Sequence, residues 1–123
     1  FLDAGIPTGL GSDSVASNNI CDLLEESRFA ALIARNMIGR KRFMSAKAAI
    51  ETATLGGAKA LGLDGKIGTL ETEKQADIAV ISLDKAAQQP VNEIHAALVF
   101  SSNARDVVMT MVAGEELLID RKW

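Results

Sequence analysis

The apolar residues between Ile20 and Ile38 recur at spacings of three and four, which is the period of one face of an α-helix. Acidic side chains gather in the early turns and basic ones near the end, as the helix dipole favours. Ser17, Asn18 and Asn19 precede this stretch, and such side chains accept hydrogen bonds from the free N–H groups of a first turn. The pattern predicts a helix of about five turns that begins near Ile20.

Glycines divide the rest of the first half. Gly39 is suited to end the first predicted helix. Ser45 begins an alanine-rich stretch that predicts a second helix. Gly56 and Gly57 predict a break into two short helices, and Gly62 predicts the end of the second one.

Short apolar runs predict strands elsewhere in the chain. Residues 6–13 indicate a brief buried strand, and residues 78–83 indicate another. Residues 93–102 predict a shorter strand or extended segment. Residues 106–120 predict a hairpin with its turn at Ala113–Gly114, because β-branched and methionine residues flank a turn signal.

The character of the chain changes near residues 62–66, where helix-like sequence gives way to strand-like sequence. We therefore predict an α/β fold in two parts, residues 1–62 and residues 63–123. The chain has 123 residues, of which 48% are hydrophobic, and this is enough to form a buried core.

Charge and composition exclude several classes of function. The formal net charge of −3 gives no indication of a nucleic-acid or anionic membrane partner. No apolar run approaches the ~18 residues that span a bilayer. The single Cys21 fits a reducing compartment, so we expect a cytoplasmic protein. The single His95 cannot supply the several histidine ligands that a catalytic zinc or iron site usually needs.

Asp13 is the candidate active-site residue. It is the last residue of the predicted strand 6–13 and lies among small residues that leave room around its carboxylate. From spacing alone, an aspartate beside serine in a loop is most often a turn or helix cap. A catalytic role is the alternative that the residues leave open.

Residues 9–36 resemble the end of the last barrel strand, and the helix after it, in metal-dependent amidohydrolases of the branch that contains chlorohydrolases and S-adenosylhomocysteine deaminases. The matching motifs are Gly11-Ser12-Asp13, Ser17-Asn18-Asn19 and Glu25-Glu26. Residues 53–84 are similar to the family's Ala-Thr-x-x-Gly-Ala-x-x-Leu-Gly segment and the strand after it, and residues 106–118 to its closing hairpin. Glu73 departs from the pattern, because many relatives have glycine there.

The resemblance implies that residues 1–62 are the C-terminal end of a TIM-type (β/α)8 barrel and that residues 63–123 are part of a small β-sandwich domain. The fold would then be incomplete within this chain. The family's His-x-His motif and two further histidines are absent from the 123 residues. We therefore expect a C-terminal fragment of a larger enzyme, with the other metal ligands outside this chain.

The resemblance also assigns chemistry to residues. It implies that Asp13 contacts a divalent metal, zinc or alternatively iron, and acts as the catalytic acid and base on metal-activated water. Ser14 and Asn18 are candidate contacts to a small-molecule substrate, although Asn18 is also suited to capping. The implied reaction is hydrolysis of a non-peptide carbon–nitrogen bond, with deamination of an aminated heterocycle preferred over dechlorination or cyclic amide opening.

Two other interpretations stay open at this point: a non-catalytic, stand-alone α+β module, and one subunit of a split barrel. Under the enzyme interpretation, the 123 residues alone should be inactive and should bind no zinc tightly. Helices without the strands that they cover would leave apolar surface exposed, so we also expect a homo-oligomer.

Overall fold

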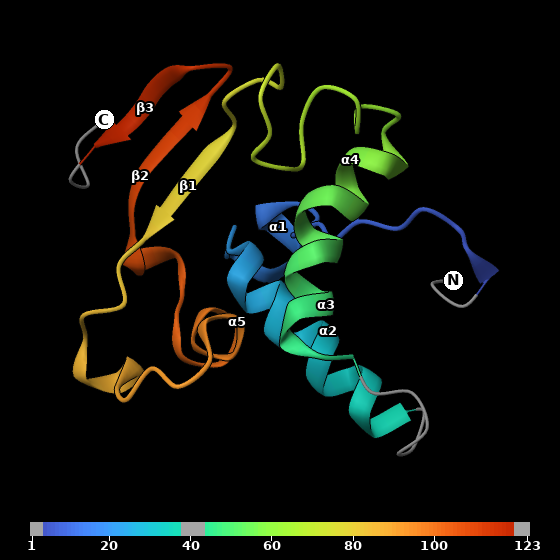
Figure 1. Ribbon diagram of the computed structural model, residues 1–123. Helices are drawn as coiled ribbons and strands as arrows, with labels where there is room; N and C mark the ends of the chain where they lie inside the picture. The colour runs from blue at the N-terminus through green and yellow to red at the C-terminus, as the bar shows by residue number, and fades with distance from the viewer. Residues whose placement is uncertain (1–3, 38–43, 120–123) are drawn as a thin grey trace.

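A computed structural model describes residues 4–37 and 44–119. Figure 1 shows a group of helices on one side and a three-stranded sheet on the other. This is a mixed helix and sheet structure, as predicted. The α-helices are α1 (Val15–Asn18), α2 (Leu23–Met37), α3 (Ala46–Glu51), α4 (Gly57–Ala60) and α5 (Ile94–Ala96), and the strands are β1 (Ile78–Ile81), β2 (Val107–Val112) and β3 (Glu115–Ile119).

The strand predicted at residues 6–13 is not formed. This segment has no regular secondary structure, because no described strand lies beside it to complete a hydrogen-bonded ladder. It lies instead against the helix made by α3 and α4. A Cβ placed on Gly9 would be 2.7 Å from Gly57 Cα, and one placed on Gly56 would be 2.5 Å from the Thr8 carbonyl oxygen. Glycine is therefore required for this close approach.

The long helix begins later than predicted. Ser14 caps the single turn of α1, and Asn19 ends that turn with a φ of 60°. Asp22 then begins α2 by accepting hydrogen bonds from the N–H groups of its first turn. The predicted start near Ile20 is therefore wrong by three residues, and the predicted end at Gly39 lies outside the described residues.

The second helical region does not break at its two glycines. Ser45 caps α3 as predicted, through its Oγ and the Ala48 N–H. A π-helical turn, Thr52–Gly56, then joins α3 to α4, and both glycines keep right-handed helical angles. Gly62 ends the region with a φ of 68°, as predicted. The glycines at positions 56 and 57 thus serve close packing rather than a break.

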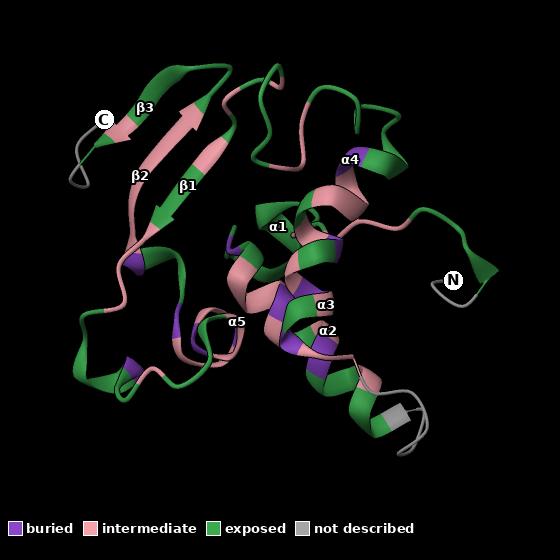
Figure 2. Cartoon of the chain, in the orientation of Figure 1, coloured by how far each residue is buried: buried purple, intermediate pink, exposed green. Residues whose placement is uncertain are grey.

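The buried core lies where α2, α3 and residues 94–101 meet (Figure 2). Residues 94–101 are helical, α5 followed by the π-helical turn Ala97–Ser101, so the strand predicted at 93–102 is wrong. Glu93 caps this helix, and packing against two other helices buries its apolar face. The core cluster consists of Ala31, Ala46, Ala49 and Val99.

The sheet is antiparallel, in the order β1-β2-β3. β1 is shorter than the predicted strand 78–83. The hairpin between β2 and β3 is confirmed, and its turn residues Ala113 and Gly114 both have positive φ, 51° and 86°, as a type I′ turn requires. Glu73 also has a positive φ of 72°, which explains why glycine suits that position.

Apolar side chains remain exposed on both sides of the molecule. On α2, Phe29 is 48% exposed and Ile33 is 54% exposed, and on the sheet Val80, Val112 and Leu117 are exposed. None of the described helices is long and apolar enough to cross a membrane. The two-part division at residues 62–66 stays a prediction, and residues 94–101 pack on the helices of the first part.

Candidate functional site

Asp13 follows residues 6–12, which have no regular secondary structure, and precedes Ser14, the residue that caps α1. Its side chain is exposed, and its backbone has a φ of 55°, in the left-handed region that aspartate tolerates better than most residues. The Ser17 hydroxyl donates to Asp13 Oδ2 over 3.2 Å. One edge of the carboxylate is therefore fixed by α1, while the group as a whole stays open to solvent.

Ser14 and Asn18 lie at the two ends of α1, which follows Asp13. Ser14 Oγ accepts a hydrogen bond from the Ala16 N–H at 3.1 Å, so Ser14 is the N-cap of this turn. Asn18 is the last residue of the turn, and its Oδ1 accepts from the Ile20 N–H at 3.0 Å. Both side chains are exposed. The structure brings Asp13, Ser14 and Asn18 into one loop, and a substrate contact for either of the last two stays a prediction.

The amide of Asn18 also joins this loop to α2. Its Nδ2 donates to the Ser12 carbonyl oxygen at 3.3 Å and to Glu26 Oε1 at 3.1 Å. Ser12 Oγ lies 3.3 Å from Cys21 Sγ. The residues on either side of Asp13 are thus tied to the start of the long helix.

Asp22, nine residues after Asp13, has a different environment. It is buried, and its Oδ1 accepts the N–H groups of Leu24 and Glu25 at 3.0 and 3.2 Å. Its Oδ2 accepts the N–H of Ala104 at 2.7 Å. This carboxylate caps α2 and links it to the segment that precedes β2.

Arg28 makes a second link between the same regions. Its Nε donates to the Val99 carbonyl oxygen at 3.0 Å, and its Nη2 donates to that of Ser102. The Ser102 side chain is buried, and its Oγ accepts from Gln88 Nε2 at 3.0 Å. The guanidinium therefore satisfies carbonyl groups left free where the helix of residues 94–101 ends.

A metal ion would find one suitable ligand in this loop. Within residues 4–37 and 44–119, no three His, Cys, Asp or Glu residues are grouped closely enough to hold a metal. Asp13 offers an exposed carboxylate with one oxygen already oriented by Ser17, which fits one oxygen ligand of a divalent ion. His95 lies on α5, where its Nδ1 is 2.6 Å from Oε1 of the N-cap residue Glu93. The described residues are thus compatible with a partial metal site.

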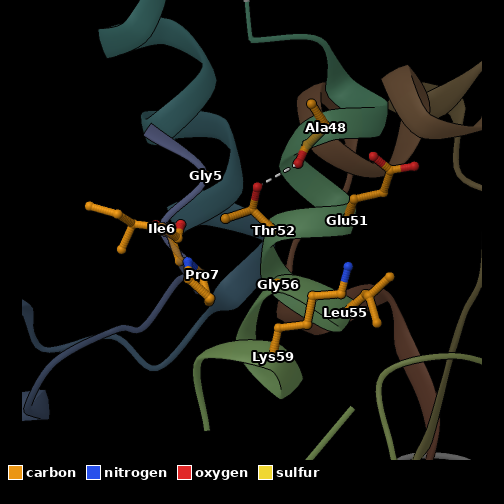
Figure 3. Close-up of a pocket in the computed structure, with 10 residues that line it drawn as sticks. Gly5, Ile6, Pro7, Ala48, Glu51, Thr52, Leu55, Gly56 and Lys59 are labelled. Atoms are coloured by element: carbon orange, nitrogen blue, oxygen red, sulfur yellow. Dashed lines mark hydrogen bonds between the residues drawn. The ribbon is translucent and has the colours of Figure 1, made fainter. Parts of the chain in front are cut away.

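An open pocket lies between residues 5–8 and the second helical region (Figure 3). It has a volume of about 460 Å³, and α3, the π-helical turn Thr52–Gly56 and α4 form its helical wall. Neither Asp13 nor α1 contributes to its lining. The Thr52 hydroxyl at this pocket donates to the Ala48 carbonyl within its own helix, at 2.7 Å. The candidate site is therefore the Asp13 loop rather than this pocket.

Comparison with known families matches residues 1–117 to the model of the amidohydrolase family. The chain belongs to the amidohydrolase family. It is 38% identical over 118 residues to 5-methylthioadenosine/S-adenosylhomocysteine deaminase of Moorella thermoacetica, and the match covers 96% of this chain and 28% of that protein. The chain thus spans about 28% of the length of this relative.

Two solved structures of amidohydrolases are also similar to this chain. One is an adenosine deaminase from Xanthomonas campestris with bound zinc, with a TM-score of 0.93, 32% identity, and coverage of 98% of this chain and 27% of that one. The other is atrazine chlorohydrolase from Arthrobacter aurescens complexed with zinc, with a TM-score of 0.89 and the same identity and coverage. The resemblance to deaminases and chlorohydrolases found in the sequence is confirmed.

Sequence reasoning missed two contributors to the loop. The sequence places Glu26 in the acidic early turns of a helix and in a motif that the family shares, but it does not predict that Glu26 binds Asn18. The main-chain carbonyl of Ser12 carries no signal in the sequence, because its role depends on the turn at Asp13. The i and i+8 spacing of Asn18 and Glu26 is not a helical neighbour relation, so only the intervening turn brings the two side chains together.

Proposed function

We propose that this chain is the C-terminal part of a metal-dependent hydrolase that deaminates an aminated heterocycle. Residues 1–62 would be the last strand and helices of a (β/α)8 barrel, and residues 63–123 would be part of a small β domain. The histidine ligands would come from residues outside this chain. The observation that carries the proposal is the exposed position of Asp13 between residues 6–12 and α1. Residues 6–12 would become the last strand when paired with strands from outside this chain, and barrel enzymes place their sites at strand ends.

A bound divalent ion would activate a water molecule for attack, because such an ion lowers the pKa of the bound water to about 7. Asp13 would accept a proton from that water and return it to the leaving nitrogen. Ser17 supports this role, because its hydrogen bond to Oδ2 orients the carboxylate. Zinc is the ion that we propose first, since two similar structures contain it, and iron is the alternative.

Adenine nucleosides are the substrates to test first. Two relatives that are 38% and 40% identical to this chain are named 5-methylthioadenosine/S-adenosylhomocysteine deaminase. Ser14 and Asn18 remain candidate substrate contacts from this chain. A chlorotriazine is the second candidate, because the chlorohydrolase structure matches over 98% of the chain.

We also propose that the complete protein is a homo-oligomer and cytoplasmic. The exposed apolar side chains of α2 and of the sheet support association, either with the rest of the protein or with a second copy. Mass measurement of the complete protein in solution tests the oligomer, and a mass of one chain would contradict it.

The test of function uses the complete protein loaded with zinc. We expect ammonia release from adenosine, 5-methylthioadenosine or S-adenosylhomocysteine, and loss of that activity in Asp13→Asn. Chloride release from a chlorotriazine without ammonia release would instead support dechlorination. Failure to act on all of these compounds, with zinc bound, would contradict the proposal.

A further inference from the structure

The side chain of Asn18 makes hydrogen bonds to three separate parts of the chain. Its Nδ2 donates to the Ser12 carbonyl and to Glu26, and its Oδ1 accepts from the Ile20 N–H. An asparagine side chain can make four hydrogen bonds at most in this arrangement, so most of its capacity is in use. We infer that Asn18 and Glu26 are positioning residues, which hold the Asp13 carboxylate in its catalytic orientation; this inference rests on the proposed function.

The bond to the Ser12 carbonyl acts on the peptide unit that joins Ser12 to Asp13. Asp13 has a φ of 55°, a conformation that costs an L-residue free energy unless the surroundings hold it. The torsion φ describes rotation about the N–Cα bond that follows this peptide unit. Fixing the carbonyl fixes the direction of this N–Cα bond, and the hydrogen bond from Ser17 to Oδ2 then limits rotation of the Asp13 side chain about it.

Glu26 connects this local arrangement to a rigid element. It lies in the first turns of α2 and is half-buried. The beginning of α2 is itself fixed by Asp22, whose carboxylate binds the distant Ala104 N–H. Asn18 thus transmits the position of α2 to the Asp13 loop through Glu26.

The contacts favour positioning over direct substrate contact for Asn18. A substrate group that used Asn18 Nδ2 would have to replace the bond to Ser12 or the bond to Glu26. The two roles predict different kinetics. Loss of a positioning residue lowers kcat because the proton acceptor is displaced, whereas loss of uniform substrate binding raises KM.

The experiment compares four variants of the complete, zinc-loaded enzyme. Asn18→Ala removes all three hydrogen bonds, and Glu26→Ala removes the anchor on α2. Glu26→Gln keeps an oxygen that can accept from Asn18 Nδ2. Glu25→Ala is the matched control, because it removes a carboxylate from the same turn, and the hydrogen bonds of Asn18 among the described residues do not include Glu25.

We expect kcat to fall by about 10- to 100-fold in Asn18→Ala and by about 10-fold in Glu26→Ala, since small displacements of a catalytic group have effects of this size. KM should change by less than about twofold in both variants. Glu26→Gln and Glu25→Ala should keep the wild-type kcat. Zinc content and thermal unfolding midpoint are measured for every variant, and if Asn18→Ala does not fold, the Glu26→Ala and Glu26→Gln pair decides the question.

The positioning role is overturned if Glu26→Ala keeps the wild-type kcat, if Glu26→Gln loses as much as Glu26→Ala, or if Asn18→Ala raises KM with kcat unchanged. The last result would assign Asn18 to substrate binding. Asp13→Asn separates this inference from the proposed function. If that variant stays active, the function of the site is wrong; if it is inactive while Asn18→Ala and Glu26→Ala are fully active, only the positioning role is wrong.

Discussion

Asp13 and Asp22 are nine residues apart, and their surroundings are opposite. Asp22 is 6% exposed and uses both carboxylate oxygens to accept three backbone N–H groups. Asp13 is exposed and accepts one hydrogen bond within the described part of the chain, from the Ser17 hydroxyl. In the sequence, Asp13 lies before the predicted helix and Asp22 lies in its early turns, and neither position shows how far each side chain is buried. The difference shows that hydrogen-bond saturation and burial, rather than residue type, separate a structural carboxylate from one that is available for chemistry.

The largest expected effect follows replacement of the available carboxylate. In the complete enzyme, Asp13→Asn should lower kcat by about 10³-fold, because general acid and base catalysis by a placed side chain contributes on this order. The free energy of unfolding should stay near that of the wild type, since the exposed side chain accepts only one hydrogen bond. Steady-state kinetics and urea unfolding of the same preparation check both. If the variant stays active, or if it is inactive and also strongly destabilised, the distinction between a chemically available Asp13 and a structural Asp22 is wrong.

Replacement of Asp22 should mainly lower the free energy of unfolding, whereas replacement of Asp13 should mainly lower kcat. Asp22→Ala leaves the first turn of α2 uncapped and leaves the Ala104 N–H without its acceptor. Loss of a cap and of a buried partner together should lower the free energy of unfolding by roughly 3 kcal/mol. Urea unfolding measures this loss. The comparison fails if Asp22→Ala has wild-type stability and lower kcat than Asp13→Asn.

Two adjacent glycines test how firmly the segment that ends at Asp13 must be held. A Cβ on Gly56 would lie 2.5 Å from the Thr8 carbonyl oxygen, so Gly56→Ala should displace residues 6–12 and cost about 2 kcal/mol. Gly57→Ala is the matched control, because a Cβ there meets no atom within 4 Å, and it should stabilise the helix by about 0.5 kcal/mol. Thermal unfolding of both variants gives the sign of each effect. Equal effects would contradict the close approach.

The smallest expected effect concerns a third carboxylate, Glu93, which is exposed but bonded at a helix start. The hydrogen bond with the His95 side chain, and then the one from the Ala96 N–H, hold the pKa of Glu93 below its ordinary value of 4.5. A lowered pKa gives stability that is present above the ordinary value and is lost as the pH falls through the folded-state pKa. The stability difference between wild type and Glu93→Gln should therefore shrink below about pH 4.5. A difference that stays constant down to acid pH would exclude this linkage.

The helical part was predicted well where the signal was local and periodic. The structure contains four features that depend on neighbours in the sequence: the apolar stripe of α2, the Ser45 cap, the Gly62 end and the hairpin turn. Two predictions, the helix break at Gly56 and the strand at residues 93–102, are wrong because of tertiary packing. Gly56 was interpreted as a helix breaker because its close contact with Thr8 cannot be seen in the sequence.

The segment at residues 94–101 shows the same limit. Its apolar run fits a strand as well as a buried helix, since short runs do not distinguish the two. The Glu93 cap was the local signal for a helix. For the candidate site, the sequence indicated Asp13 and its neighbours, and their functional roles stay predictions. The contact of Asn18 with Glu26 depends on the turn between α1 and α2 and could not be predicted.

Because residues 94–101 pack on α2 and α3, proteolysis between the two halves should not separate them. Residues 61–66 are exposed and connect α4 to the second half, so a protease could sever the backbone there. The two pieces would stay in contact, because Val99 of the second piece is buried among alanines of α2 and α3 in the first. The hydrogen bonds of Arg28 and Asp22 also join the two pieces. Cleavage at this connection should therefore yield a nicked, non-covalent complex, and the two halves made separately should reassociate only if the second piece carries this helix.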